Sequence, residues 1–238
     1  MRKLCIGALC IVLLLCTAAC GQTVDEPYSA AFTIRPPESL TAVYFDTPYV
    51  SETFVVRDDA LDYNALRELY IGSLFGAETE YAARWSTPLL YALEGEFTTQ
   101  DAQTMSALAV ELARTDGFPG MRETAAADAN VHIRFQKSDT PLFRYDADAS
   151  GRIRSVEITV PSAYLPVQRN AIVRQYMMRG CGFFQTVQTT LDSVLAQRPA
   201  SDLRDADFIL LNILYGGVEP GADKAACLAA FDQFFAGE

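Results

Sequence analysis

Residues 169–191 read RNAIVRQYMMRGCGFFQTVQTTL and contain no Asp or Glu. Apolar side chains dominate this stretch, and Pro161 and Pro166 stand in front of it, so we expect a long central helix near residues 169–196. Two glycines, Gly180 and Gly182, lie in its middle. A helix of this composition belongs in the core of a domain, and the other elements are placed around it.

The segments before this helix carry both helical and strand patterns. An acidic start at Asp58-Asp59 and apolar residues at helical spacing predict a helix that ends near Gly76. The run LLYALEG at residues 89–95 is predicted to be a strand. Thr98 or Thr99 can cap the next helix, which has one apolar face and ends at residues 116–117.

The pattern then changes to strands, and it returns to helices at the end of the chain. In residues 131–135 apolar and polar side chains alternate, which is typical of a half-buried strand. PLFRY and RIRSVEITV flank DADASG and predict a hairpin, while residues 201–217 and 222–235 are predicted to be helical. The order favours an α+β domain, with helices packed on a mixed sheet.

The first residues have the pattern of a bacterial secretion signal. Arg2-Lys3, the apolar run LCIGALCIVLLLC and the small residues before Cys20 predict a lipoprotein signal peptide at residues 1–20, with Cys20 as the lipidated residue. Cleavage near Ala19 without lipid is the alternative. Residues 21–60 are predicted to form a tether with one or two strands, and residues 61–238 the α+β domain. Gly21, rather than Asp, favours the outer membrane over the inner one.

We therefore expect a protein of the cell envelope that faces the periplasm and is held to the membrane by its lipid. The net charge is −11 over 238 residues. Such an acidic chain repels phosphate backbones, and no basic cluster with interleaved aromatics is present, so a nucleic-acid partner is not expected.

Two cysteines remain after the signal and the lipidated residue are set aside. They are Cys181 and Cys227, and an oxidising periplasm favours a disulfide between them. Two buried thiols that act as small apolar groups are the alternative.

A zinc peptidase helix needs two histidines four residues apart, with a glutamate beside the first as general base. The corresponding positions of the central helix would be 184–188. Phe184 cannot bind a metal, Gln185 cannot accept a proton at working pH, and Gln188 is a poor zinc ligand. The pattern argues against a catalytic zinc at this helix, and we expect no cofactor.

His132 is the single histidine of the chain, so a site with several histidines is excluded. A metal site with unusual ligands could combine His132 with Glu78 and Glu157, and a nucleophilic pair of Cys181 with His132 is conceivable. On the polar side of a strand, however, a histidine is more often simply exposed or hydrogen-bonded. The chain has no nucleotide-binding loop, dinucleotide fingerprint or G-x-S-x-G elbow.

Residues 146–157 match a calcium-loop pattern through Asp146, Asp148, Ser150 and, at the twelfth position, Glu157. Calcium loops of this kind join helices, whereas this one lies between two predicted strands. A hairpin turn that contains glycine explains the same residues.

Several short motifs, in this order and spacing, resemble the bacterial domain-of-unknown-function family 2927 over roughly residues 62–235. They are Phe75-Gly76-Ala77-Glu78, Trp85, Asn130-Val131, Cys181 followed by Gln188, the run FILLNILY at residues 208–215 and Glu219-Pro220-Gly221. The resemblance implies a secreted or lipid-anchored protein with a zincin-like architecture, and it brings no established activity. Typical members carry a Glu-Glu pair where this chain has Phe184 and Gln185, so the chain departs from the family at the two carboxylates.

Three functions follow as expectations. The first is a binding or scaffolding protein of the envelope, with a degenerate zincin-like fold and a cleft for a peptide or protein partner. The second is a metal-dependent peptidase with unusual ligands. The third is a structural lipoprotein that spaces or caps an envelope assembly.

Overall fold

The computed structural model describes residues 43–44, 53–54, 61–76 and 79–236. The predicted signal peptide, the lipidation residue Cys20 and the possible ligand Glu78 lie outside the described residues. In the tether region, β1 (Val43–Tyr44) and β2 (Thr53–Phe54) pair antiparallel.

A mixed sheet of five strands forms the centre of the domain. Its strands are β3 (Leu89–Gly95), β4 (Met121–Glu123), β5 (Val131–Gln136), β6 (Leu142–Ala147) and β7 (Ile153–Pro161). The order across the sheet is β4-β3-β5-β7-β6, and the pairs are parallel except for the β6–β7 hairpin, which is antiparallel. The predicted α+β class and the predicted hairpin are confirmed.

Alternation along the strands gives the sheet two different faces. On β5, the side chains of Val131, Ile133 and Phe135 are fully buried, whereas His132 and Arg134 are partly exposed on the opposite face. This is the half-buried strand that the sequence predicts, because successive strand residues point to opposite sides.

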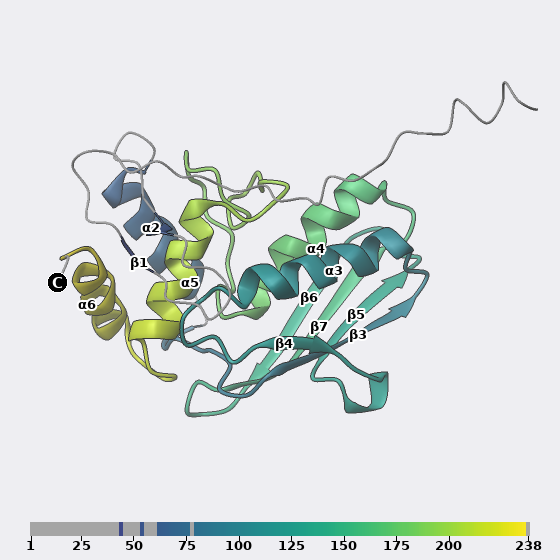
Figure 1. Cartoon of the computed structure of the whole chain (residues 1–238), viewed down its shortest axis with the longest axis horizontal. Helices are drawn as coiled ribbons and strands as arrows, with labels where there is room; N and C mark the ends of the chain where they lie inside the picture. Colours follow the sequence, from purple (N-terminus) through teal and green to yellow (C-terminus); the bar gives the residue numbers. More distant parts are fainter. Residues whose placement is uncertain (1–42, 45–52, 55–60, 77–78, 237–238) are drawn as a thin grey trace, which may run out of the picture. The chain divides into compact units, whose positions relative to one another are not determined.

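Helices α3 (Thr99–Leu112) and α4 (Pro166–Gly180) lie side by side on the buried face of the sheet, as Figure 1 shows. Thr98 caps α3, and a capping box joins it to Asp101, so one of the two predicted caps is confirmed. Met105, Leu108 and Leu112 form the buried face of α3 that their spacing predicts.

The remaining helices pack on one another and on the core. They are α2 (Tyr63–Leu74), α5 (Asp205–Gly217) and α6 (Lys224–Phe235), and a short 3₁₀ helix, η1, covers Ala126–Asp128. Two hydrogen bonds join α5 to neighbouring segments: the Tyr215 hydroxyl donates to the carbonyl of Cys181, the C-cap of α4, at 2.8 Å, and Arg84, before β3, donates to the carbonyl of Tyr215 at 2.6 Å. One continuous apolar core results.

The central helix is shorter than predicted. It ends at Gly180, with Cys181 as its C-cap, and residues 181–204 contain no helix or strand. Gly182 has a φ of +121°, which is not a helical conformation, so the chain leaves the helix at this residue. A Cβ there would collide with the carbonyl oxygen of Ala83, so the turn requires glycine. Positions 184–188 are consequently not helical, and the expectation that they continue the central helix was wrong.

None of the helices within the described residues is long and apolar enough to cross a membrane.

Candidate functional site

Strand β6 is one edge of the sheet. Among the described residues it pairs only with β7, in the register Phe143↔Ile158 and Tyr145↔Val156. An edge strand presents a row of backbone donors and acceptors that another extended chain can use. This free side of β6 is the centre of the candidate site.

Two aromatic residues of β6 point to the helix side of the sheet. Phe143 contacts Tyr176 of α4, with ring centroids 5.8 Å apart, and Tyr145 stacks on Phe184 at 3.8 Å with an interplanar angle of 10°. Tyr145 remains 40% exposed, although Phe184 is buried beneath it. The edge therefore offers a half-covered aromatic surface.

Arg179, in the last turn of α4, lies above this surface. Its guanidinium carbon is 4.4 Å from the centroid of the Phe143 ring and 5.1 Å from that of Tyr176. Its Nε donates to the carbonyl oxygen of Phe184 at 2.9 Å. We call Phe143, Tyr145, Tyr176, Arg179 and Phe184 the β6 ledge.

The residues compared above with zinc ligands have structural roles. Phe184 belongs to the β6 ledge, and the backbone N–H of Gln185 donates to the carbonyl of Ser73 at 3.0 Å. Gln188 is exposed.

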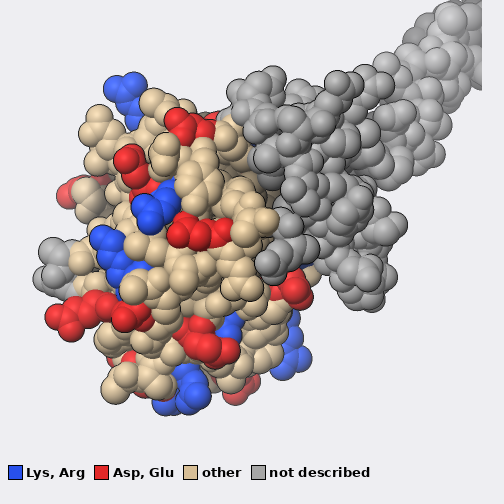
Figure 2. Space-filling view, turned by 90° about the vertical axis from the view of Figure 1, so that its left-hand side faces the viewer, with Lys and Arg blue, Asp and Glu red and all other residues tan. Residues whose placement is uncertain are grey.

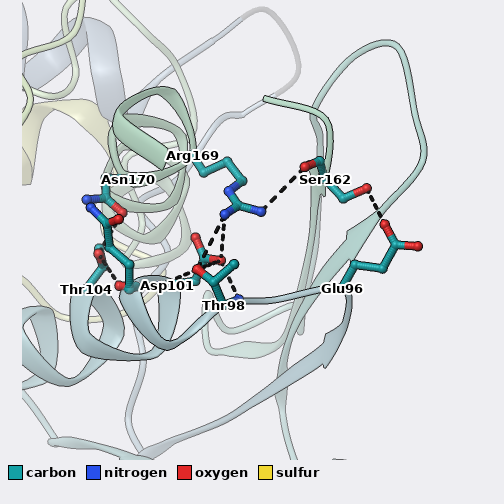
Figure 3. A network of polar contacts seen from close by, with 8 residues as sticks. Glu96, Thr98, Asp101, Thr104, Ser162, Arg169 and Asn170 are labelled. Atoms are coloured by element: carbon teal, nitrogen blue, oxygen red, sulfur yellow. Dashed lines mark hydrogen bonds and ion pairs between the residues drawn. The ribbon is translucent and has the colours of Figure 1, made fainter. Parts of the chain in front are cut away.

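A buried polar network ties α3 to α4 at the carboxyl ends of β3 and β7, as Figure 3 shows. Arg169 and Asp101 form an ion pair of 3.3 Å with side chains 6% and 0% exposed. The Asp101 carboxylate also accepts from the backbone and hydroxyl of Thr98, at 2.7 and 2.8 Å. The Ser162 hydroxyl donates to Glu96 at 2.7 Å, at the rim of the network. These contacts position the start of α4 on the sheet.

His132 lies on the face of the sheet that the helices do not cover. Its Nδ1 is 2.7 Å from Glu94, and that hydrogen bond is the main reason why the pKa of the Glu94 carboxyl is lowered. Glu157 is its register neighbour on β7. Among the described residues no group of three His, Cys, Asp or Glu side chains is arranged to hold a metal. His132 and Cys181 do not meet. His132 lies on the face of the sheet without helices, whereas Cys181 is buried at the end of α4, which packs on the other face.

Of the calcium-loop residues, Asp148 and Ser150 lie in the turn of the β6–β7 hairpin, whereas Asp146 lies on β6 and Glu157 on β7. One oxygen of Asp148 accepts from the hydroxyl and the backbone of Ser150, at 2.6 and 2.9 Å, and the other pairs with Arg154 at 2.6 Å. The Ser150 hydroxyl is the largest cause of the lowered pKa of Asp148. Glu157 lies four residues beyond the start of β7, about 13 Å along the strand, so it does not join Asp146, Asp148 and Ser150 at one site.

Both remaining cysteines are buried, free thiols in the structure, and no disulfide joins them. Burial raises the pKa of Cys181 to about 12 and that of Cys227 to about 11. They fit the alternative expectation of small apolar groups, because a protonated thiol is unreactive.

Charge is mixed on the face that Figure 2 shows. Acidic and basic side chains alternate there among uncharged ones, without a continuous patch of one sign. A nucleic-acid interface would need such a basic patch.

The sequence did not single out the β6 ledge. It predicted the hairpin, but it did not indicate that Phe143, Tyr145 and Arg179 would meet, because they lie on β6 and α4 and the contact depends on how the two elements pack. The aromatic pair at alternate positions of PLFRY, in a strand with polar neighbours, was the available signal.

Comparisons with known proteins identify no relative. No family model, no curated protein and no solved structure matches this chain, so the resemblance to family 2927 and the zincin-like architecture stay predictions.

Proposed function

We propose that this chain is a lipid-anchored protein of the cell envelope whose α+β domain binds an extended peptide segment along β6 and does not act as a catalyst. The observation that carries the proposal is that the outer edge of β6 pairs with no other described strand and lies beside the β6 ledge. Main-chain hydrogen bonds to such an edge supply affinity, and pockets for alternate side chains supply specificity.

The architecture supports a degenerate zincin-like domain. A mixed sheet with an antiparallel edge strand and a helix across it agrees with the resemblance stated above. Helix α4 contains no His, Asp, Glu or Cys, so it offers no zinc ligand and no carboxylate base. A groove without the reacting groups can keep its affinity for peptides and lose turnover.

The alternative is a metal-dependent peptidase with His132 and Glu157 among its ligands. These two residues are neighbours in the sheet, but they lie on the face away from α4 and from the β6 ledge. The two functions therefore place a bound peptide on different faces of the sheet, which makes them separable by experiment.

The test is selection of random 12-residue peptides, displayed with both ends fused, against the purified full chain in detergent. We expect enriched peptides to protect the backbone amides of residues 142–147 from hydrogen exchange. Tyr145→Ala should weaken their binding about tenfold or more, because it removes one large aromatic contact. Phe97→Ala is the matched control, since Phe97 is 43% exposed in the loop after β3.

Two results would overturn the proposal. One is the absence of any enriched peptide, or protection confined to another part of the chain. The other is cleavage of the enriched peptides that stops when a chelator is added, which would establish the peptidase instead.

A further inference from the structure

One partly buried arginine has no carboxylate partner among the residues that the structure describes. Six other described arginines are partly or fully buried, and each has a carboxylate oxygen 2.6–3.8 Å away. They are Arg67, Arg84, Arg134, Arg169, Arg174 and Arg204. Arg179 is also partly buried, and it forms no ion pair with any described carboxylate.

The described arginines and lysines that lack an ion pair are otherwise exposed. They are Arg114, Arg122, Lys137, Arg144, Arg152, Arg198 and Lys224. Water solvates those charges, whereas burial lowers the pKa of Arg179, against the contribution of Tyr176. A half-desolvated guanidinium in a chain of net charge −11 is a place where an outside anion is favoured.

The contacts of Arg179 hold it in place, and no described carboxylate is among them. Nε donates to the Phe184 carbonyl, and the rings of Phe143 and Tyr176 flank the guanidinium. A guanidinium has five N–H donors in a planar fork, and those on the two Nη atoms suit a carboxylate. The aromatic flanks fix the plane of this fork, so little side-chain entropy is lost when an anion binds.

The position of Arg179 relates it to the proposed peptide. A residue of an added strand that lies opposite Phe143 would project its side chain to the helix side of the sheet, because paired residues share a face. Arg179 lies over Phe143 on that side. A carboxylate on the paired residue would therefore reach the guanidinium.

We infer that Arg179 binds a carboxylate of the peptide segment that pairs with β6. This inference rests on the proposed function and specifies its ligand: an extended segment with an acidic side chain at one fixed position or with its own C-terminal carboxylate there. A structural cation at the C-terminus of α4 is the competing explanation, since such a charge also favours the helix dipole.

Two displayed libraries separate the two sources of the carboxylate. Peptides fused at both ends have side-chain carboxylates alone, whereas a second library leaves the C-terminus free. In wild type we expect Asp or Glu at one fixed position of the enriched peptides in the first library, or a fixed distance to the free end in the second. Replacing Glu by Gln, or the free acid by an amide, should weaken binding about tenfold or more.

The variant Arg179→Met should remove this preference and leave binding of the neutral peptides and protection of residues 142–147 in place. Arg122→Met is the matched control, because Arg122 is an exposed arginine of β4, at the opposite edge of the sheet, and it should keep the preference. If Arg179→Met does not fold in urea titrations, Arg179→Lys serves instead, and its preference should be reduced but present.

The outcomes distinguish the two proposals. Peptides that protect β6 without a fixed carboxylate, or that keep their acidic preference in Arg179→Met, would overturn the role of Arg179 and leave the peptide-binding function standing. Absence of enriched peptides in both libraries, or protection elsewhere, would overturn the function and this inference with it.

Discussion

The ion pair of Arg169 and Asp101 illustrates how much a single contact can decide. Both side chains are almost completely buried, and the Asp101 carboxylate also closes the capping box of α3. Because each charge is compensated by the other, removing one leaves an uncompensated charge in the core, which typically costs 3–5 kcal/mol. The pair therefore controls how the starts of α3 and α4 meet.

We expect Arg169→Met to lower the free energy of unfolding by about 3 kcal/mol or more, because it leaves the Asp101 carboxylate buried without its cation. Urea unfolding followed by circular dichroism measures the change. Arg152→Met is the control, since Arg152 is exposed and should change stability by no more than about 0.5 kcal/mol. A loss below about 1 kcal/mol for Arg169→Met would mean that the pair behaves like a surface salt bridge.

At the scale of residues, the sequence indicates the role of a side chain better than its partner. Thr98 was predictable as a cap because its contact with Asp101 spans three residues. The partner of Asp101 is Arg169, which is far along the chain, and nothing in the local pattern indicates it. His132 was correctly placed on the polar side of a strand, but its bond to Glu94 depends on the pairing of β3 with β5.

At the scale of elements, residues 181–204 are the largest departure from expectation. Segments of this length without helix or strand are uncommon in compact domains, and this one is held by specific contacts. Val187 exchanges backbone hydrogen bonds with Leu195 and Gln197, each of 2.9 Å. Asp207 of α5 accepts from the Ser193 hydroxyl at 2.6 Å and from the Val194 amide at 3.1 Å.

Local signals explain which elements were predictable. Helix α3 has its own cap and apolar face, and β5 has strict alternation, so both could be predicted from short windows of sequence. The end of α4 could not, because the turn at Gly182 is imposed by its approach to the Ala83 carbonyl, about a hundred residues earlier in the chain. Apolar residues such as Phe184 fit a helix as well as a buried loop, and the stacking partner Tyr145 decides between them.

Asp207 makes the stability of this segment depend on pH. Burial raises its pKa to about 6, from about 3.9 in an unfolded chain. Between these values the folded state keeps a proton that the unfolded state has lost, so the contribution of Asp207 to the free energy of unfolding falls as pH rises from about 4 to 6 and is level above. The slope is at most about 1.4 kcal/mol per pH unit for one proton.

The variant Asp207→Asn should lack this term. We expect the unfolding free energy of wild type, relative to the variant, to increase when the pH is lowered from 7 to 4, as measured by urea unfolding at each pH. Asp202→Asn is the control within the same segment, because Asp202 is 57% exposed and is not among the groups that shift the pKa of Asp207, so its removal should leave the difference in place. Parallel pH profiles for wild type and Asp207→Asn would contradict the assignment.

For the whole molecule, the coarse architecture followed from the sequence and the site did not. Helical and strand periodicities were sufficient for an α+β domain with a mixed sheet. The β6 ledge needed the packing of α4 on β6. That Arg179 has no carboxylate partner among the described residues emerges only from comparison with the other buried arginines. The zinc-binding alternative was weakened by residue types, which require no structure, because α4 lacks His and Glu.

The proposed place of the molecule in the cell depends on Cys20, which lies outside the described residues. Small residues before this cysteine and the apolar run that precedes them predict lipidation, and two or more acyl chains provide the stable anchoring that one acyl chain cannot give.

We expect wild type to partition into the detergent phase after extraction of bacterial envelopes and Cys20→Ser to leave that phase. Cys16→Ser is the matched control, because it changes the same atom within the segment that is removed and should keep the anchor. Intact-mass measurement supplies the contrary outcome: a mature chain cut near Ala19 with an unmodified Cys20 would mean secretion without a lipid, and the peptide-binding domain would then act free of the membrane.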